Sequence, residues 1–210
     1  MKTYLKTIKF LQTFFLGISI ALMLVLPLVL AFYPEWLSPQ AILNLYDVSH
    51  VSIFFVMLVR PLADILLGVK WIRPLVILRK GVGVLSASVV VSFIFSKIIM
   101  DPAGYLGAFG TSAYWSLTNY ALLAHLADIS AIILLITSNN LSKRVMGALW
   151  KKVQKLSYVF FYASSFFVFL SYGDIGPIVS VVIITIVTVV AHQKNKARAI
   201  TTQNTNPQTA

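Results

Sequence analysis

The stretch TSNNLSKRVMGALWKKVQKLSY, residues Thr137–Tyr158, separates two apolar runs and decides how the chain is folded. One apolar run ends at Ile136, a polar Thr-Ser-Asn-Asn segment follows, and a second apolar run begins at Leu156. Between them lie five basic residues: Lys143, Arg144, Lys151, Lys152 and Lys155. Two membrane-spanning helices joined by a positively charged turn at the lipid surface have this pattern. The stretch therefore predicts one helix that leaves a membrane and another that returns into it.

The composition of the whole chain also indicates an integral membrane protein. Of its 210 residues, 59% are hydrophobic and 11% are charged, and the mean hydropathy is +0.87. An ordinary soluble domain has about 25% charged residues. The chain has no cysteine, which excludes disulfides, iron–sulfur clusters and thiolate metal sites. Because the net charge of +11 is confined to short loops, we expect its partner to be a bilayer with anionic inner-leaflet lipids, and not nucleic acid.

Six apolar runs predict six membrane-spanning helices. A helix rises about 1.5 Å per residue and must cross a hydrocarbon layer of roughly 30 Å. The expected fold is an all-α integral membrane protein, a six-helix transmembrane bundle over residues 1–192. Its approximate spans are 10–32, 41–61, 82–100, 117–136, 156–172 and 176–192. The polar segment 193–210 is expected to be a disordered cytoplasmic tail.

The segment between the second and third spans is mixed in character. Residues 62–80 combine basic residues with Leu, Ile and Trp, which predicts an amphipathic connection lying along the cytoplasmic surface. An alternative keeps the second helix in the membrane as far as Val69. Arg60 and Asp64 would then be a buried pair at i, i+4 spacing.

The distribution of basic residues predicts the orientation of the bundle. Fifteen of the 17 Lys and Arg lie before residue 10, in residues 70–80, in the Thr137–Tyr158 stretch or in Lys194–Arg198. These four segments fall on one side of a six-span bundle, and the side rich in Lys and Arg is the cytoplasmic one. We therefore expect both termini in the cytoplasm.

Two segments resemble motifs of a known membrane family. Arg79-Lys80-Gly81-Val82-Gly83 is similar to an R-R-x-L-G opening of a third helix. The Thr137–Tyr158 stretch is similar to T-S-N…R-x-L-G-x-x-W-x-x-L-H-x-L-x-Y between a fourth and a fifth helix. The matching residues of this second motif are Thr137, Ser138, Asn139, Arg144, Gly147, Trp150 and Tyr158.

Together these motifs resemble the ferric-reductase-like transmembrane family. Within it they are most similar to the branch of heme-binding membrane subunits of bacterial methionine sulfoxide reductase systems. The resemblance covers roughly residues 47–172. It implies electron transport in the bacterial cytoplasmic (inner) membrane, b-type heme, and a separate redox or assembly partner protein.

The chain departs from that family where heme is bound. The family holds heme with histidines on its third and fifth helices, because imidazole is the usual axial ligand of heme iron. The corresponding positions are Phe93, Gln154 and Phe167. Phenylalanine cannot ligate iron, so we expect no cofactor, or heme b if there is one.

Four ionisable residues lie well inside the predicted spans. His50 follows Asp47 by three residues, and Asp128 follows His125 by three. Ionisable groups in a membrane are costly and are functional candidates by default. The two histidines could bind a relocated cofactor, each oriented by its carboxylate. Alternatively, all four groups hydrogen-bond across helices or lie near the outer interface, which is the interpretation we favour.

These observations predict a non-catalytic, partner-binding descendant of the heme subunits that is itself free of heme. One alternative is an active electron-transfer subunit that uses His50 and His125. Another is a small proton-coupled transporter, although we see no internal repeat that would support it. Nothing resembles a nucleotide-binding G-x-G-x-x-G unit, a P-loop or a nucleophile elbow. The sequence therefore assigns neither a catalytic residue nor a metal site, and leaves open whether the chain is an enzyme.

Overall fold

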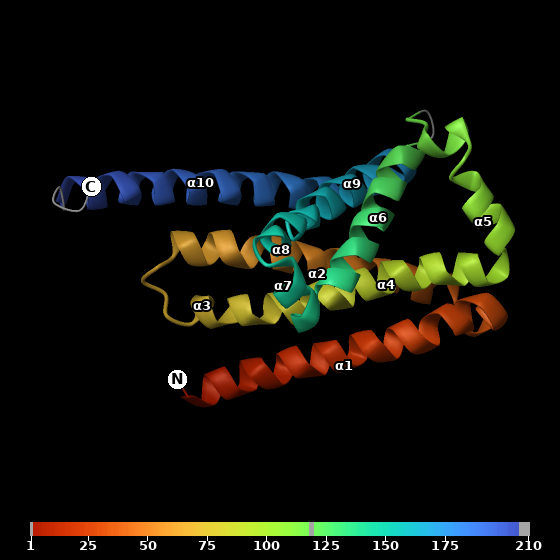
Figure 1. Ribbon diagram of the computed structural model, residues 1–210, viewed down its shortest axis with the longest axis horizontal. Coiled ribbons are helices and arrows are strands. Elements are labelled where there is room, and N and C mark those ends of the chain that lie inside the picture. The colour runs from red at the N-terminus through yellow and green to blue at the C-terminus, as the bar shows by residue number, and fades with distance from the viewer. Residues whose placement is uncertain (1, 118–119, 206–210) are drawn as a thin grey trace.

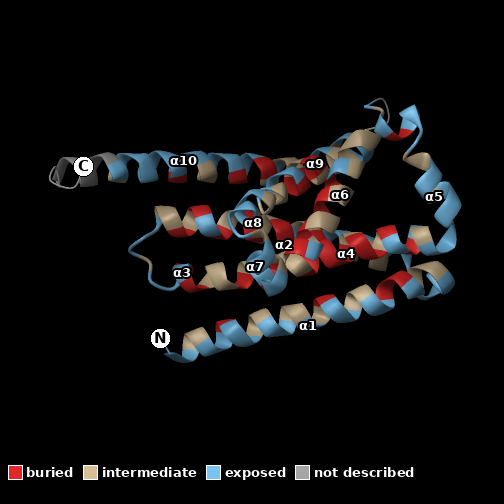
Figure 2. Cartoon of the chain, in the orientation of Figure 1, coloured by how far each residue is buried: buried red, intermediate tan, exposed pale blue. Residues whose placement is uncertain are grey.

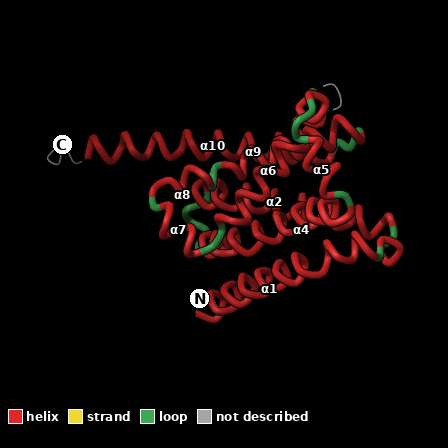
Figure 3. Tube along the Cα trace, turned by 45° about the vertical axis from the view of Figure 1, so that its right-hand side comes forward, coloured by secondary structure: helices red, strands yellow, loops and turns green. Residues whose placement is uncertain are grey.

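Helices make up nearly all of the chain that the computed structural model describes, residues 2–117 and 120–205. No β-strand occurs within those residues, so the predicted all-α class is confirmed. The long helices are α1 (Lys2–Phe32), α2 (Pro39–Ile65), α4 (Arg79–Met100), α6 (Ala121–Thr137), α9 (Leu156–Tyr172) and α10 (Gly176–Thr205). The short helices are η1 (Pro34–Trp36), α3 (Ile72–Leu75), η2 (Val76–Leu78), α5 (Pro102–Ala108), η3 (Ser112–Trp115), α7 (Asn140–Met146) and α8 (Ala148–Val153). Figure 3 shows that only short loops join them.

Five helical segments of the described chain are long and apolar enough to cross a membrane. They are Lys2–Phe32, Pro39–Ile65, Ile72–Met100, Ala148–Tyr172 and Gly176–Ala199. The count reaches six if α6 and α7, which are bent by 93° at their junction, form one broken span. Alone, the 17 residues of α6 reach only about 25 Å, less than the roughly 30 Å of a hydrocarbon core. This set of helices is consistent with an integral membrane protein.

Helices α2, α4, α6 and α9 form the centre of the bundle. Both α4 and α9 pack against α2 and against α6, so α2 and α6 stand diagonally opposite each other. Helix α1 packs on α4, and α10 packs on α2 and α9. Buried residues are accordingly densest in α4, whereas α1 and α10 expose most of their surface (Figure 2).

The two ends of the bundle differ in chemistry. The beginning of α1, α3 and the last turns of α10 lie at one end, and α5 lies at the other (Figure 1). Helices α7 and α8 join the ends of α6 and α9 that are remote from α5. They carry four of the five basic residues of the Thr137–Tyr158 stretch, and the fifth, Lys155, lies just before α9. We call the first the basic end, formed by residues 2–9, 60–80, 140–155 and 191–199. We call the second the aromatic end, formed by α5 and η3.

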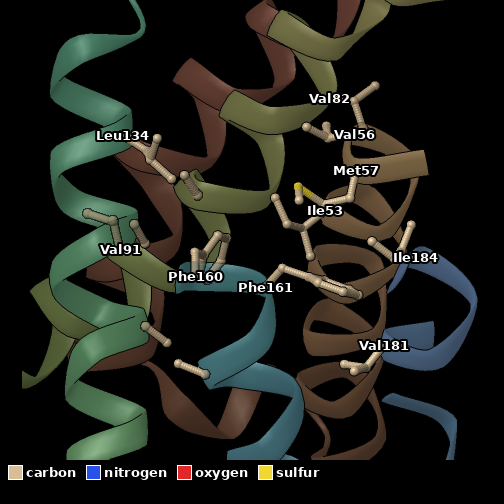
Figure 4. Close-up of a cluster of buried hydrophobic side chains, with 14 of the residues drawn as sticks. Ile53, Val56, Met57, Val82, Val91, Leu134, Phe160, Phe161, Val181 and Ile184 are labelled. Atoms are coloured by element: carbon tan, nitrogen blue, oxygen red, sulfur yellow. The ribbon is translucent and has the colours of Figure 1, made fainter. Parts of the chain in front are cut away.

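Two phenylalanines of α9 fill the centre of the bundle. Phe160 and Phe161 are 2% and 0% exposed, and they belong to one apolar cluster with residues of α2, α4, α6 and α10. In Figure 4, Phe161 lies beside Ile53 of α2 and near Ile184 and Val181 of α10. Close packing of this kind is the main source of helix association in lipid, because lipid tails are as apolar as the core itself.

Serine hydroxyls form hydrogen bonds between α2 and α4. Ser49 of α2 and Ser86 of α4 each donate to the other's backbone carbonyl, at 3.1 Å and 2.8 Å. Along α4, Ser88, Ser92 and Ser96 are also buried at every fourth position. Small hydroxyl side chains let membrane helices come close and satisfy their own hydrogen bonds. This serine face explains why α4 can be central without large side chains along its length.

The segment after the second span differs from the prediction. Helix α2 continues to Ile65, and α3 and η2 lead directly into α4, so that Ile72–Met100 can be taken as one span. Ile72, Pro74 and Leu78 are buried in it. The expected surface helix over residues 62–80 is therefore replaced by a short turn at residues 66–71. Ile72 and Leu78 pack inside the bundle, whereas Leu66, Leu67 and Trp71 of the turn are exposed.

The C-terminal segment also differs from the prediction, because α10 extends through residue 193 to Thr205. Gln, Lys, Ala and Arg, which favour helices, follow the apolar part. Its last turns also contact α2: Asn195 Nδ2 donates to the Asp64 carboxylate at 3.4 Å, and Arg198 donates to the Asp64 carbonyl at 2.9 Å. The structure gives helix as far as Thr205, the disorder of residues 193–210 stays a prediction, and residues 206–210 lie outside the described chain.

Candidate functional site

His50 lies in the interior of the bundle, on the face of α2 that meets α9. Its ring stacks on the fully buried Phe161 with the centroids 5.9 Å apart and the planes 25° apart. Its Nε2 is buried and has no hydrogen-bond partner within the described residues. Asp47, one turn earlier, is exposed. No hydrogen bond joins Asp47 to His50 within the described residues, so the geometry gives no support to Asp47 as the group that orients this ring.

His125 lies at the aromatic end, near the start of α6. Its ring stacks face to face on Tyr114 of η3, with the centroids 3.3 Å apart and the planes 6° apart. Trp115 meets the same ring edge-on at 6.3 Å. Its Nδ1 is buried and likewise unpartnered within the described residues. Two aromatic side chains of η3 are therefore the immediate surroundings of His125.

The structure does not bring the two histidines together. Their helices, α2 and α6, are diagonal in the bundle, and each ring lies on a different aromatic side chain. Phe161 occupies the central space beside His50. Within the described residues, no group of three or more His, Cys, Asp or Glu could hold a metal ion. The geometry thus gives no support to a cofactor shared by His50 and His125.

Asp128 is placed among tyrosines of the aromatic end. Burial raises the pKa of Tyr105 in α5, and the negative charge of Asp128 adds to this effect. Burial likewise raises the pKa of Tyr114, with smaller contributions from Tyr105 and Asp128. The Asp128 carboxyl is therefore near enough to these phenols to influence them. Within the described residues no hydrogen bond pairs it with His125, so the geometry gives no support to Asp128 as the group that orients that ring.

The three positions that the resemblance aligns with heme histidines are built into the packing. Phe93 stacks on Tyr46 of α2 with the centroids 4.5 Å apart and the planes 10° apart. Gln154 donates from Nε2 to the hydroxyl of Thr137 at 3.3 Å, which ties α8 to the end of α6. Phe167 contacts Tyr172 edge-on at 6.3 Å within α9. These residues do not fit a heme: none can ligate iron, and Phe160 and Phe161 fill the bundle centre.

A cavity at the basic end was not foreseen from the sequence. It measures about 180 Å³ and opens between α2, α4, α9 and α10. Its lining includes Arg60, Asp64, Arg79 and Thr188. Arg60 and Asp64 had been considered only as partners of each other, yet no ion pair joins them in the described chain. One feature of the sequence pointed to this cavity. Arg60 ends one apolar run and Arg79 precedes the next, so in the predicted bundle both lie on the same side of the membrane.

Comparison with known proteins adds no assignment. The chain matches no protein-family model, no curated protein and no solved structure.

Proposed function

We propose that the chain is a heme-free, non-catalytic membrane protein that acts by binding a partner protein. The observation that carries this proposal is the use of Phe93, Gln154 and Phe167 as packing and hydrogen-bonding residues at the positions where the ferric-reductase-like family has heme ligands. A descendant that kept the helical scaffold and lost the ligands retains surfaces for assembly, without a means of moving electrons. Its partner is then a separate redox or assembly protein.

We further propose six membrane spans with both termini in the cytoplasm of a bacterial cell, in its inner membrane. The basic residues of four segments gather at one end of the bundle, which supports this orientation. Helices α7 and α8 lie at that end. Their exposed apolar residues Leu141, Val145 and Leu149 recur at every fourth position beside Lys and Arg. An amphipathic segment of this kind lies in the membrane interface and binds anionic lipids.

The second candidate is an electron-transfer subunit that uses His50 and His125. One observation favours it: His50 Nε2 and His125 Nδ1 are both buried and unpartnered in the described chain. A histidine that binds iron needs one ring nitrogen that makes no hydrogen bond within the protein. The diagonal placement of α2 and α6, with Phe161 beside His50, makes this candidate the weaker one.

The optical spectrum of the purified protein distinguishes the two candidates. Protein extracted in a mild detergent from cells that make ample heme is expected to have no Soret band and no reduced b-type peaks after dithionite. A Soret band with split reduced peaks would favour the electron-transfer candidate. If that band disappears in both the His50→Ala and the His125→Ala variant, these residues are the ligands and the heme-free proposal is wrong.

Cysteine labelling tests the proposed orientation in the full-length protein. The chain has no native cysteine, and Gly68 and Gly107 are exposed glycines with nothing within 4 Å of an added Cβ. We expect a membrane-impermeant maleimide to label Gly107→Cys in intact cells with an opened outer membrane. Gly68→Cys should be labelled only after the inner membrane is opened, and so should Lys2→Cys. Labelling of Gly68→Cys or Lys2→Cys in intact cells would contradict the orientation.

A further inference from the structure

Cationic side chains from two helices meet in the cavity at the basic end. Arg60 comes from the last turns of α2 and Arg79 from the start of α4, and both line the cavity. The one acidic residue in its lining is Asp64. Its carboxylate accepts a hydrogen bond from Asn195 of α10 at 3.4 Å. Two guanidinium groups against one carboxylate leave the cavity with an excess of positive charge.

These guanidinium groups have N–H donors that make no hydrogen bond within the described residues. Arg79 Nε donates to the carbonyl of Val56 at 2.9 Å, which fixes the half-buried side chain in place. Its terminal amino groups have no hydrogen-bond partner in the described chain, and Arg60 has neither a hydrogen bond nor an ion pair there. A guanidinium presents a planar fork of five N–H donors that matches the oxygens of a phosphate. Two cationic side chains in the lining of a cavity, with only one carboxylate beside them, are suited to an oxyanion.

A third donor, on a residue that lines the cavity, lacks a partner as well. The hydroxyl of Thr188, on α10, is buried and has no hydrogen-bond partner in the described chain. Leaving a buried hydroxyl unsatisfied costs free energy, so such a group calls for an explanation. Most threonines in these helices donate to their own helix, as Thr185 does to the Val181 carbonyl at 2.8 Å. Thr188 is an exception at the place where the arginines meet.

The size and position of the cavity suit a phosphate group. Its volume of about 180 Å³ is far above the roughly 10–15 Å³ that holds one water molecule. It opens where the apolar parts of α2 and α10 end, next to the basic segments of the chain. Basic pockets between membrane helices at this level bind phosphate-bearing head groups.

We propose that this cavity is a binding site for a phosphate oxyanion, held by Arg60, Arg79 and the hydroxyl of Thr188. The phosphate belongs either to the head group of an anionic lipid or to a soluble phosphate compound, and the chemistry of recognition is the same for both. This proposal does not depend on the absence of heme. It can be right or wrong independently of the proposed function.

The experiment uses the full-length protein with two phosphate sources. In the first arm, native mass spectrometry counts phosphatidylglycerol bound to protein released from nanodiscs that contain this lipid and phosphatidylcholine. In the second arm, inorganic phosphate is titrated against protein in a neutral detergent, and the shift of the Tm is followed. The variants are Arg60→Gln and Thr188→Val, with Arg73→Gln as the matched control. Arg73 is exposed at the same end and does not line the cavity.

We expect Arg60→Gln to weaken binding about tenfold and Thr188→Val about three- to tenfold, because a hydrogen bond to a charged group is lost in each. Both variants should fold, since neither side chain has a hydrogen-bond partner in the described chain. If these variants, but not Arg73→Gln, lose binding of phosphatidylglycerol, the ligand is a lipid phosphate. If they lose only the Tm shift caused by inorganic phosphate, the ligand is a soluble phosphate compound. Either result supports the site. Binding of neither probe, or equal binding by all variants, overturns it.

Discussion

Replacing Phe161 with alanine is expected to lower the free energy of unfolding by about 3 kcal/mol. Phe161 is fully buried, belongs to the apolar cluster at the bundle centre and carries the ring of His50 on its face. Its removal leaves a cavity that neighbouring helices can fill only partly. The expected value lies at the lower end of the range for soluble cores, because transfer out of water contributes little when the surroundings are lipid.

Phe166 on the same helix provides the matched control for this variant. It is 40% exposed, so Phe166→Ala removes an equal volume from the surface of the bundle and should cost less than about 0.5 kcal/mol. Unfolding by sodium dodecyl sulfate in mixed micelles, followed by circular dichroism or tryptophan fluorescence, measures both variants. Equal losses for the two phenylalanines would show that Phe161 is not at the bundle centre.

Replacing Gly81 with alanine is expected to loosen the contact between α1 and α4. A Cβ at this position would lie 2.8 Å from the backbone oxygen of Gln12 and 3.2 Å from Phe15 Cβ, both in α1. A backbone atom cannot turn aside as a flexible side chain can, so α1 must shift. Overpacking of this kind costs about 1–3 kcal/mol, against a gain of about 1 kcal/mol from exchanging glycine for alanine in a helix.

Gly83 lies two residues further along α4 and serves as the control for helix propensity. A Cβ there would be 3.5 Å from Val56 Cγ2, which is an ordinary contact. Gly83→Ala should therefore be neutral or stabilise the protein by up to about 1 kcal/mol. The same unfolding measurement should place Gly81→Ala about 2 kcal/mol below Gly83→Ala. If Gly81→Ala were as stable as Gly83→Ala, the close approach of α1 to α4 would be wrong.

Much of the helical pattern could be predicted from the sequence, since long apolar runs in a membrane have only one way to satisfy their backbone groups. The predicted fifth span, 156–172, coincides with α9, and the second, 41–61, lies within α2. Boundaries failed where polar residues continue a helix, as in α10 beyond residue 192, because tertiary contacts of Asn195 and Arg198 with Asp64 are not visible in sequence. The start of α6 was placed too early, because Tyr120 has a left-handed φ of 55° and the helix follows it.

The candidate site was less predictable than the fold. His50 and His125 could be singled out as ionisable residues inside spans, yet the sequence does not say which helices are neighbours and which are diagonal. That arrangement decides whether two rings can share a ligand. The cavity at the basic end combines Arg60, Arg79 and Thr188 from three helices, and no local motif connects them. The spacing of Ser88, Ser92 and Ser96 was a signal for close helix packing that could have been used.

The heme-to-protein ratio of the purified protein tests the central claim most directly, measured by the pyridine hemochrome method together with protein mass. The claim is that packed side chains occupy the positions that the resemblance aligns with heme ligands, so introducing histidines there alone should not create heme binding. We expect a ratio near zero for the unchanged protein and for a Phe93→His, Phe167→His double variant, because Phe160 and Phe161 fill the centre in both. A ratio near one heme per chain in the unchanged protein would contradict the account, and a ratio near one in the double variant would show that the heme pocket has remained open.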